Sequence, residues 1–327
     1  MYNRRVKKWW IVILLIVLAI AITVIAVIDY RNYVAKQERD SEVKSQTDYD
    51  VVYYNGEAYK YNSNIKNILF MGIDNNAEIQ FQSMPGTNGQ ADCIMILSLD
   101  KKNKTGTIFQ ISRDSMTEID IYDSNGNRHT TMEGQLALQY AYGSGAKNSC
   151  WAMKKTVSEL LYELPIAGYV AMDIAAVSKV NDLLGGVTLI VPEDYTAIDA
   201  SFVQGQTITL SGEQAEKYVR YRDVNEMGSS HTRMRRQAQY IPALFETFQT
   251  EVGDDETKMK QLYSAVSQYL VTDLSADEIE ELMEYTWDIE NITYMEGEIV
   301  EGEEFEEFHV DSDALQKKII ELYYQQK

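Results

Sequence analysis

The pattern of apolar and polar positions separates one long apolar segment near the start of the chain from a series of shorter elements after it. Residues 9–28 are apolar except for Thr23, and a helix of this length spans about 30 Å, which matches a bilayer core. A cleaved signal peptide has a shorter apolar region that ends in small residues. The pattern therefore predicts a retained transmembrane helix at 9–28, with residues 1–8 as a cytoplasmic tail. The basic residues that favour this orientation are Arg4, Arg5, Lys7 and Lys8.

The rest of the chain is then expected on the outer side of the cell membrane. Residues 29–64 predict a polar stalk followed by a hairpin, because Val51–Tyr54 and Glu57–Tyr61 flank the turn-forming pair Asn55-Gly56. Later apolar runs predict strands. These runs are Ile65–Met71, Cys93–Leu99, Thr105–Ile111, Gly168–Met172 and Val187–Val191.

Helix signals lie between these strands. Ser211 with Gln214, and Ser275 with Glu278, match the capping box that begins many helices. Ser149 is expected to cap another helix, and a further helix should pass through 183–184 and stop at 185–186, two glycines. Strands that alternate with helices predict an α/β sandwich.

Composition narrows the class of partner. The formal net charge of −20 argues against nucleic acid and against resting on anionic lipid. Cys93 and Cys150 are too few for a disulfide scaffold and lack the spacing of a metal pair, so a disulfide and two buried thiols both stay open. The acid-rich residues 296–313 are interpreted as a solvated edge without function.

Arginines gather in one short window of this acidic chain. Five of the seven arginines after residue 64 lie within residues 220–236, which we call the arginine window. A solvated basic helix face is one interpretation, but clustering against an acidic background favours a site for an anion, which arginine can hold with two parallel hydrogen bonds. His231 lies in this window and is interpreted as a surface histidine. The five arginines are Arg220, Arg222, Arg233, Arg235 and Arg236.

Charged residues also mark three predicted strand ends. Asp74 follows the first apolar strand, and Arg113 and Asp114 follow the third. Asp92 begins the second strand, so it faces the same rim only if that strand is antiparallel. Ligands of open α/β sheets gather at such a rim, and Mg²⁺ takes one or two carboxylates together with phosphate oxygens. A turn or cap aspartate, or a local ion pair between Arg113 and Asp114, is the alternative interpretation.

Seven segments in order resemble the LytR–CpsA–Psr family over about residues 65–327. They read NILFMGID, ADCIMILSLD, IFQISRDSM, LALQYAYG, VNDLLGGVTLIVPED, LSGEQAEKYVRYRD and RMRRQ. The resemblance implies a catalytic domain that is a three-layer α/β/α sandwich around a mixed sheet, with an apolar pocket for a polyprenyl chain. It also implies transfer of a glycopolymer from a polyprenyl-diphosphate carrier to peptidoglycan, forming a phosphodiester link at the outer face of a Gram-positive membrane.

The resemblance also implies roles for individual residues. Asp74 and Asp92 match two metal-binding aspartates, for Mg²⁺ or Mn²⁺. Arg113, with its neighbour Asp114, matches the catalytic pair that contacts the diphosphate and is needed for turnover. The residues that match diphosphate ligands are Arg220, Arg222, Arg233, Arg236 and Gln237. Arg235 lies between them and outside the pattern.

The chain departs from the family pattern at several positions. Asn75 and Asn76 stand where many members have an arginine, Gln135 stands where many have asparagine, and Ser230 replaces an acidic residue. These departures weaken any inference about the polymer. Two other functions stay open: a non-catalytic surface regulator that binds a polyprenyl diphosphate, and a hydrolase that releases lipid phosphate to water.

Overall fold

The computed structural model describes residues 51–75, 84–253, 255–288, 291–303 and 305–327. The predicted transmembrane helix at 9–28 and most of the predicted stalk therefore lie outside the described residues. Within the described ranges, no helix is both long enough and apolar enough to cross a bilayer.

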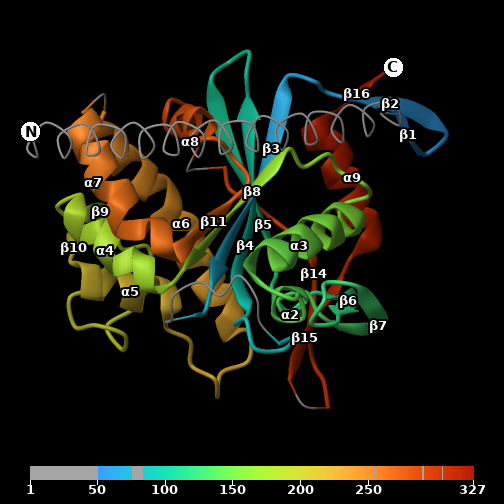
Figure 1. Ribbon diagram of the computed structural model, residues 1–327, viewed down its shortest axis with the longest axis horizontal. Helices are drawn as coiled ribbons and strands as arrows, with labels where there is room; N and C mark the ends of the chain where they lie inside the picture. Colours follow the sequence, from blue (N-terminus) through green and yellow to red (C-terminus); the bar gives the residue numbers. More distant parts are fainter. Residues whose placement is uncertain (1–50, 76–83, 254, 289–290, 304) are drawn as a thin grey trace, which may run out of the picture. The chain divides into compact units, whose positions relative to one another are not determined.

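A mixed seven-stranded sheet occupies the centre (Figure 1), in the order β11-β8-β3-β4-β5-β12, with β13 also paired with β5. Strands β3, β5, β8, β12 and β13 run parallel to one another, whereas β4 and β11 run antiparallel to their neighbours. The strands are β3 (Ile65–Ile73), β4 (Ala91–Asp100), β5 (Thr105–Ile111), β8 (Gly168–Asp173), β11 (Leu270–Thr272), β12 (Thr286–Trp287) and β13 (Thr293–Tyr294).

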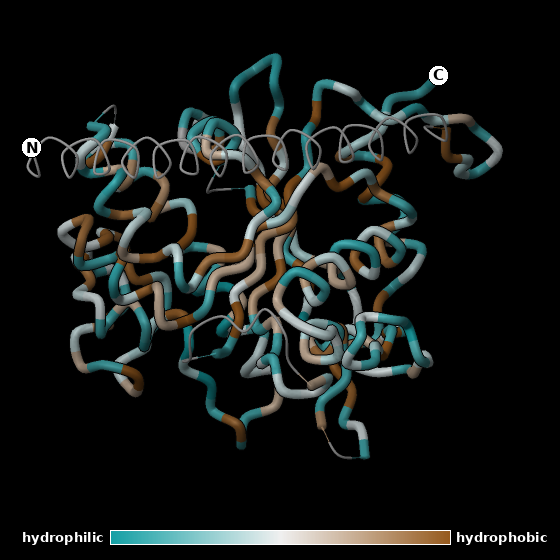
Figure 2. Tube along the Cα trace, viewed as in Figure 1, coloured by the Kyte–Doolittle hydropathy of each residue, from teal (hydrophilic) through white to brown (hydrophobic). Residues whose placement is uncertain are grey.

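The central strands are the apolar runs that the sequence predicts, lengthened by a few residues. Strand β3 continues past the predicted end at Met71 to Ile73, and β4 begins at Ala91 instead of Cys93. Continuous apolar runs are typical of strands that are buried on both faces. Figure 2 shows the most apolar stretches along these strands and the polar ones on the outer loops. The prediction of a mixed α/β fold is confirmed.

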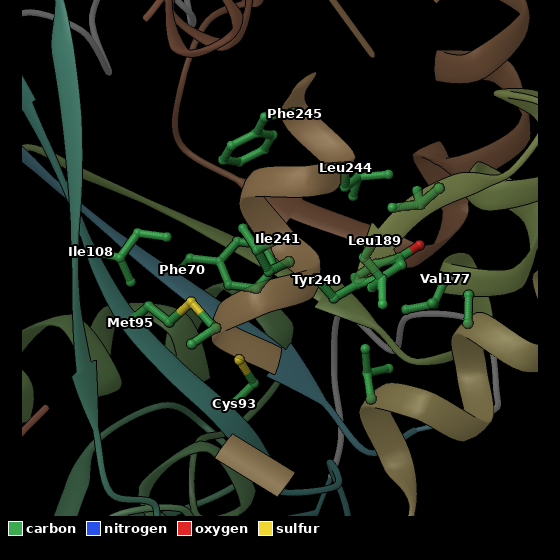
Figure 3. Packing of buried hydrophobic residues seen from close by; sticks show 14 of the residues in the cluster. Phe70, Cys93, Met95, Ile108, Val177, Leu189, Tyr240, Ile241, Leu244 and Phe245 are labelled. Carbon is green, nitrogen blue, oxygen red and sulfur yellow. The ribbon is translucent and has the colours of Figure 1, made fainter. Parts of the chain in front are cut away.

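Helices cover both faces of the sheet (Figure 1). On one face, Phe70, Met95 and Ile108 of the strands pack with Tyr240 and Ile241 of a long helix (Figure 3). Burial of each such side chain contributes roughly 1.5–3 kcal/mol. The helices of this face include α4 (Ala175–Leu183), α5 (Gly212–Arg220), α6 (Ser229–Glu251), α7 (Glu256–Val266) and α8 (Ala276–Met283), with a short 3-10 turn η1 (Ser267–Tyr269).

The other face has its own apolar cluster. Helices α3 (Ala146–Leu160) and α9 (Ser312–Tyr323) pack there, with the short α2 (Leu138–Ala141). Cys93 belongs to the first cluster and Cys150 to the second, so the sheet separates the two residues. Both are free and buried, and burial raises the pKa of the Cys93 thiol to about 12. Of the two alternatives, the structure has buried thiols.

Smaller sheets surround this core. Strand β16 at the C-terminal end pairs with β2, and Asn55 (φ 50°) and Gly56 (φ 84°) form the predicted turn between β1 and β2. The other pairs are β6 with β7, β9 with β10, and β14 with β15. Their bounds are β1 (Val51–Tyr54), β2 (Glu57–Tyr61), β6 (Met116–Tyr122), β7 (Arg128–Gln135), β9 (Val187–Ile190), β10 (Thr207–Leu210), β14 (Gly297–Glu301), β15 (Glu306–Val310) and β16 (Tyr324–Gln326).

Two predicted helix starts are confirmed and one is wrong. Both capping boxes form, with Ser211 and Ser275 as N-caps. Helix α3, however, begins at Ala146, and Ser149 lies inside it with a fully buried side chain. The Ser149 hydroxyl accepts a hydrogen bond from Nδ2 of Asn88 at 3.1 Å, so a tertiary contact and not a helix cap uses this serine.

The interpretation of residues 296–313 as a solvated edge is incomplete. They form β14, β15 and the start of α9, and Phe308 is only 2% exposed. We call the paired strands β14 and β15, residues 297–301 and 306–310, the acidic hairpin. The acidic residues Glu298 and Glu301 of β14 are exposed, whereas Glu306 and Glu307 of β15 are half-buried beside Phe308.

Candidate functional site

The topology of the sheet brings three of the predicted charged positions to one edge. Asp74 directly follows β3, and Arg113 and Asp114 directly follow β5, which is parallel to β3. Strand β4 lies between them and is antiparallel, so its first residues, including Asp92, reach the same edge. The condition that the sequence set for Asp92 is therefore met.

A β-bulge turns Asp92 toward the site. Gly72 pairs with Cys93 and Ile73 pairs with Ala91, which leaves Asp92 as the extra residue of β4. Bulges bend a strand and redirect a side chain, and they are frequent beside functional sites. A Cβ atom at Gly72 would stand 3.0 Å from the Cβ of Cys93, so glycine allows this close pairing.

Asp92 connects two guanidinium groups. Its Oδ1 lies 3.0 Å from Nε of Arg113, and its Oδ2 accepts a hydrogen bond from Nη1 of Arg233 at 2.7 Å. Arg113 also donates from Nη1 to Oδ1 of Asp114 at 2.9 Å and from Nη2 to the side-chain oxygen of Gln90. The side chains of Arg113 and Arg233 are 11% and 7% exposed, so these charges are weakly screened by water.

Arg220 forms the open side of the same site. It ends helix α5, and its Nη2 lies 3.2 Å from Oδ1 of Asp74, while Nη1 lies 3.2 Å from Oε1 of Glu216. About four-tenths of each side chain of the Arg220–Asp74 pair is exposed, 42% and 44%. An ion pair this exposed contributes little to stability, so Arg220 can exchange Asp74 for an anion at small cost.

Several buried polar atoms of this cluster have no hydrogen-bond partner among the described residues. They are Nε and Nη2 of Arg233, Oδ2 of Asp114 and Oε1 of Gln237. Burial lowers the pKa of the Arg233 guanidinium, and Asp92 opposes that shift. The charges of Arg113 and Arg222 lower that pKa further, as expected where several cations share one site. A buried charged donor without a partner is costly, and a bound anion would supply the missing acceptors.

An apolar cavity of about 50 Å³ continues inward from these charges. Arg220 and Asp74 lie at its exposed end, and Asp92, Arg233 and Gln237 line it further in. Its remaining walls come from β3, β8, α4 and α6 and include Phe70, Met172, Val177, Tyr240 and Ile241, several of which Figure 3 shows packed between the sheet and α6. The cavity thus has charged side chains as well as apolar ones in its walls.

Arg236 has a different environment from the one expected of a diphosphate ligand. It is 3% exposed, and its guanidinium donates from Nε to the carbonyl of Tyr218 at 2.7 Å and from Nη2 to the carbonyl of Tyr221. Its guanidinium also lies 5.1 Å from the ring centre of Tyr195. These contacts join α6 to the end of α5, so Arg236 holds Arg220 in place from behind.

The remaining arginines of the window, and Gln237 directly after it, divide between the site and the surface. Gln237 lines the cavity and donates from Nε2 to the carbonyl of Val219 at 3.0 Å, while its Oε1 has no hydrogen-bond partner among the described residues. Arg222 follows α5 and acts on Arg233 through its charge. Arg235 is exposed, with Nε 3.8 Å from Glu193, in agreement with its place outside the family pattern.

His231 is not the surface residue that the sequence suggested. Its Nε2 lies 3.2 Å from the hydroxyl of Ser112, and its ring lies 4.9 Å from that of Phe308. Burial lowers the pKa of the imidazole, and Asp114 opposes the shift. His231 therefore connects α6 to the loop that carries Arg113.

Two glutamines of the site lacked any sequence signal strong enough to select them. Gln90 receives a hydrogen bond from Arg113, and Gln135 donates from Nε2 to Oδ1 of Asp114 at 3.0 Å. Gln135 stands out in the sequence only as a departure from the family pattern. Neutral side chains that orient a charged residue leave no pattern of charge or spacing.

Comparison with known proteins identifies the family and the fold. Residues 24–321 match the model of the LytR_cpsA_psr family. TagU of Oceanobacillus iheyensis, a polyisoprenyl-teichoic acid–peptidoglycan teichoic acid transferase, is 25% identical over 318 residues, which cover 92% of this chain and 89% of that protein. TagV of Bacillus subtilis, a transferase of the same description, is 31% identical over 186 residues, 55% of this chain but only 42% of that protein.

Solved structures share the fold. TagT bound to LIIa-WTA matches with a TM-score of 0.57 at 22% identity, over 79% of this chain and 89% of that chain. The crystal structure of Bacillus subtilis TagV matches with a TM-score of 0.57 at 22% identity, over 80% of this chain and 97% of that chain. A likeness at such identities concerns the fold alone, but the family model covers most of the sequence. The chain belongs to the LytR_cpsA_psr family.

Proposed function

We propose that this protein transfers a glycopolymer from a polyprenyl-diphosphate carrier onto peptidoglycan and forms a phosphodiester link. The observation that carries the proposal is the buried guanidinium of Arg233, which has two donors without a hydrogen-bond partner among the described residues and lines a cavity with both charged and apolar walls. A lipid diphosphate has the matching chemistry, because its phosphates are anionic and its chain is apolar. The names of the TagU and TagV relatives support the glycopolymer as the group transferred.

The reaction makes and breaks one bond to phosphorus. A hydroxyl of the acceptor sugar attacks the phosphorus that carries the polymer, and the bond from that phosphorus to the bridging oxygen breaks. Polyprenyl monophosphate leaves with the bridging oxygen and its electron pair. In this account Arg113, Arg220 and Arg233 neutralise the charge on the phosphates, because phosphoryl transfer depends chiefly on positioning and electrostatic stabilisation.

The acceptor hydroxyl must also lose a proton. Asp114 is the candidate base, because its Oδ1 is held by Arg113 and Gln135 while its Oδ2 has no hydrogen-bond partner among the described residues. A free carboxylate oxygen beside the catalytic arginine has the right chemistry for this step. Asp92 is less suited, since both of its oxygens contact arginines, and Asp74 is paired with Arg220 through Oδ1.

Asp74 and Asp92 also suit a divalent cation, Mg²⁺ or Mn²⁺. Both line the cavity, and Mg²⁺ needs only one or two carboxylates when phosphate oxygens and water complete its shell. When bound, the cation would add positive charge beside the diphosphate. The two carboxylates now face Arg220, Arg113 and Arg233, so they would exchange these arginine contacts for the cation and leave the guanidiniums to the phosphates.

We further propose that the protein is anchored in the cell membrane with its site on the outer side. The apolar run at 9–28 and the basic residues before it support this topology. An anchor would hold the site near a carrier that never leaves the bilayer, which raises its effective concentration. Protease added to intact protoplasts should digest the part after residue 28, and protection of that part would refute the orientation.

One assay separates transfer from the two other functions. The full chain in detergent is incubated with Mg²⁺ and a synthetic polyprenyl-diphosphate glycan, with and without peptidoglycan fragments, and released polyprenyl phosphate is measured. Transfer predicts release that depends on the fragments. Equal release without fragments would identify a hydrolase, and binding without release under both conditions would identify a receptor.

A further inference from the structure

We propose that Glu306, in the acidic hairpin, is a positioning residue that joins the two parts of the phosphate site. It is not a ligand of the substrate. One part is the loop after β5 with Arg113 and Asp114, and the other is the beginning of α6, which leads to Arg233. The inference rests on the proposed function, since it concerns how the same site is held for a lipid diphosphate.

The side chain of Glu306 holds the start of helix α6. Its Oε1 accepts a hydrogen bond from the backbone N–H of Gly228 at 2.9 Å, and Gly228 is the N-cap of α6. Gly228 has a left-handed conformation (φ 78°) and no side chain with which to cap the helix. Glu306 therefore supplies, from another part of the chain, an acceptor oxygen for a backbone N–H at the start of the helix. Arg233 follows about one turn later.

The backbone of Glu306 holds the other part of the site. Its carbonyl accepts a hydrogen bond from Nε2 of Gln135 at 2.8 Å, and the same amide nitrogen donates to Oδ1 of Asp114 at 3.0 Å. Asp114 in turn pairs with Arg113. Two residues further along β15, the backbone N–H of Phe308 donates to the carbonyl of Asp114 at 2.9 Å. The hairpin thus fixes both the side chain and the backbone of Asp114.

A second connection lies beside the first. The ring of Phe308 packs against His231 of α6, and His231 contacts Ser112, the residue before Arg113. Contacts from β15 therefore reach α6 and the β5 loop through two independent routes. Displacing β15 would change the distance between Arg113 and Arg233, which both bind Asp92.

The carboxylate of Glu306 contacts a backbone N–H group and not an arginine of the site. Among the residues that the structure describes, no ion pair joins Glu306 to an arginine, in contrast to Asp92 and Asp74. Glu306 therefore does not compete with a phosphate for a guanidinium. Glu306 contributes an acceptor oxygen at a fixed place. We therefore expect its hydrogen bond, and not its charge, to be the feature that matters.

The chain offers a matched control in the next residue. Glu307 lies on the same strand, but its side chain contacts His309, with Oε2 2.8 Å from Nε2, and no hydrogen bond or ion pair among the described residues joins it to α6 or the β5 loop. Four variants are compared with the wild type: Glu306→Ala, Glu306→Asp, Glu306→Gln and Glu307→Ala. Each full-length protein is tested for binding of geranylgeranyl diphosphate with Mg²⁺, for kcat and KM in the transfer assay, and for thermal unfolding.

We expect Glu306→Ala and Glu306→Asp to weaken binding roughly fivefold to tenfold and to lower kcat, as the loss of a helix cap near a ligand would. Glu306→Gln should stay within about twofold of the wild type, because its amide oxygen still accepts from Gly228. Glu307→Ala should not differ from the wild type. If Glu306→Ala fails to fold, the aspartate and glutamine variants still decide the question.

Two results would overturn the inference. Glu306→Asp and Glu306→Ala could bind like Glu307→Ala, or Glu306→Gln could be as weak as Glu306→Asp, which would assign the effect to charge. A wild-type protein that binds no prenyl diphosphate at all would instead refute the proposed function. The two failures are therefore distinguishable.

Discussion

The arginine window and the acidic hairpin meet at the same edge of the sheet but use their charges differently. In the window, Arg233 contacts a carboxylate, lines a cavity and keeps donors that have no hydrogen-bond partner in the part of the chain that the structure describes. In the hairpin, Glu306 directs its carboxylate to a backbone N–H. The first region has charged donors that the proposed function assigns to a ligand, whereas the second uses a hydrogen bond to hold the framework. A dense run of charge therefore locates a region without showing which charges act on the substrate.

The same contrast occurs within the window itself. Arg233 and Arg236 are both buried and lie on one helix, but only Arg233 lines the cavity. The guanidinium of Arg236 instead donates hydrogen bonds to the carbonyls of Tyr218 and Tyr221. Members of one sequence cluster thus divide between binding and support, and the following changes separate these roles.

The largest effect is expected from Arg113→Ala. Arg113 contacts Asp92, Asp114 and Gln90 and is proposed to stabilise charge that develops during transfer. Its loss should cut the single-turnover rate about a hundredfold or more, with a much smaller loss of diphosphate affinity. Arg128→Ala, which removes an exposed arginine paired with Asp120, is the control. A binding loss as large as the rate loss would make Arg113 a plain ligand.

Removal of either proposed metal ligand should come next. Asp74→Asn and Asp92→Asn each leave a hard-cation site with one charged protein ligand, so Mg²⁺ affinity measured by calorimetry should fall at least about tenfold. Transfer activity should then need more Mg²⁺. Asp123→Asn, in an exposed turn whose carboxylate accepts from Asn125 and Asn127, serves as the control. Unchanged Mg²⁺ binding in both variants would remove these aspartates from the metal site.

Arg236→Ala and Arg233→Ala should differ in kind. Arg236→Ala leaves two carbonyls without their charged donors, so the free energy of unfolding should fall by about 3 kcal/mol or more. Arg233→Ala should chiefly weaken binding of a prenyl diphosphate. Arg235→Ala, whose ion-pair partner is at 3.8 Å on the surface, should change either quantity by less than about 0.5 kcal/mol. Chemical denaturation and binding isotherms on the three variants test this, and similar effects at all three would mean that the window is a solvated face.

The smallest effect is expected from Asp173, whose carboxyl group has no ion pair among the described residues. Asp173 ends β8 beside Ile73, and burial raises the pKa of its carboxyl to about 7. Because the folded-state pKa lies above the unfolded value, the folded protein holds the proton longer, and stability should fall as the pH rises from about 4 to about 7.

Asp173→Asn removes that titration. The variant should gain stability relative to the wild type by about 1–3 kcal/mol more at pH 8 than at pH 5. Denaturant unfolding at the two pH values measures the difference. If the difference in free energy of unfolding between the variant and the wild type is the same at both pH values, the pKa of Asp173 in the folded protein lies in the usual range of an aspartate.

Much of the fold follows from local sequence. The Asn55-Gly56 turn, the capping boxes at Ser211 and Ser275, and the long apolar runs depend on neighbours along the chain, and the structure has all of them. The prediction that Ser149 caps a helix was wrong, because its hydroxyl accepts a hydrogen bond from Asn88, which is distant in sequence. Strands such as β14 and β15 lack a strong local pattern and are fixed by pairing across the fold.

The site was predictable to the extent that charge and strand ends reveal it. Asp74, Asp92, Arg113, Arg220 and Arg233 come together as the sequence suggested, although their roles stay predictions. The bulge that turns Asp92, the inward position of Arg236 and the contacts of Glu306 all depend on register and packing. Neither charge nor spacing encodes these features, so the sequence alone could not provide them.

The most direct test of the account is analysis of the transferred product. Wild-type protein is incubated with Mg²⁺, a polyprenyl-diphosphate glycan and peptidoglycan fragments in ¹⁸O-labelled water, and both products are examined by mass spectrometry. The account predicts a single phosphate joining the glycan to the acceptor sugar, no ¹⁸O in either product, and an equal amount of polyprenyl monophosphate. A glycan phosphate that carries ¹⁸O and no acceptor would contradict it.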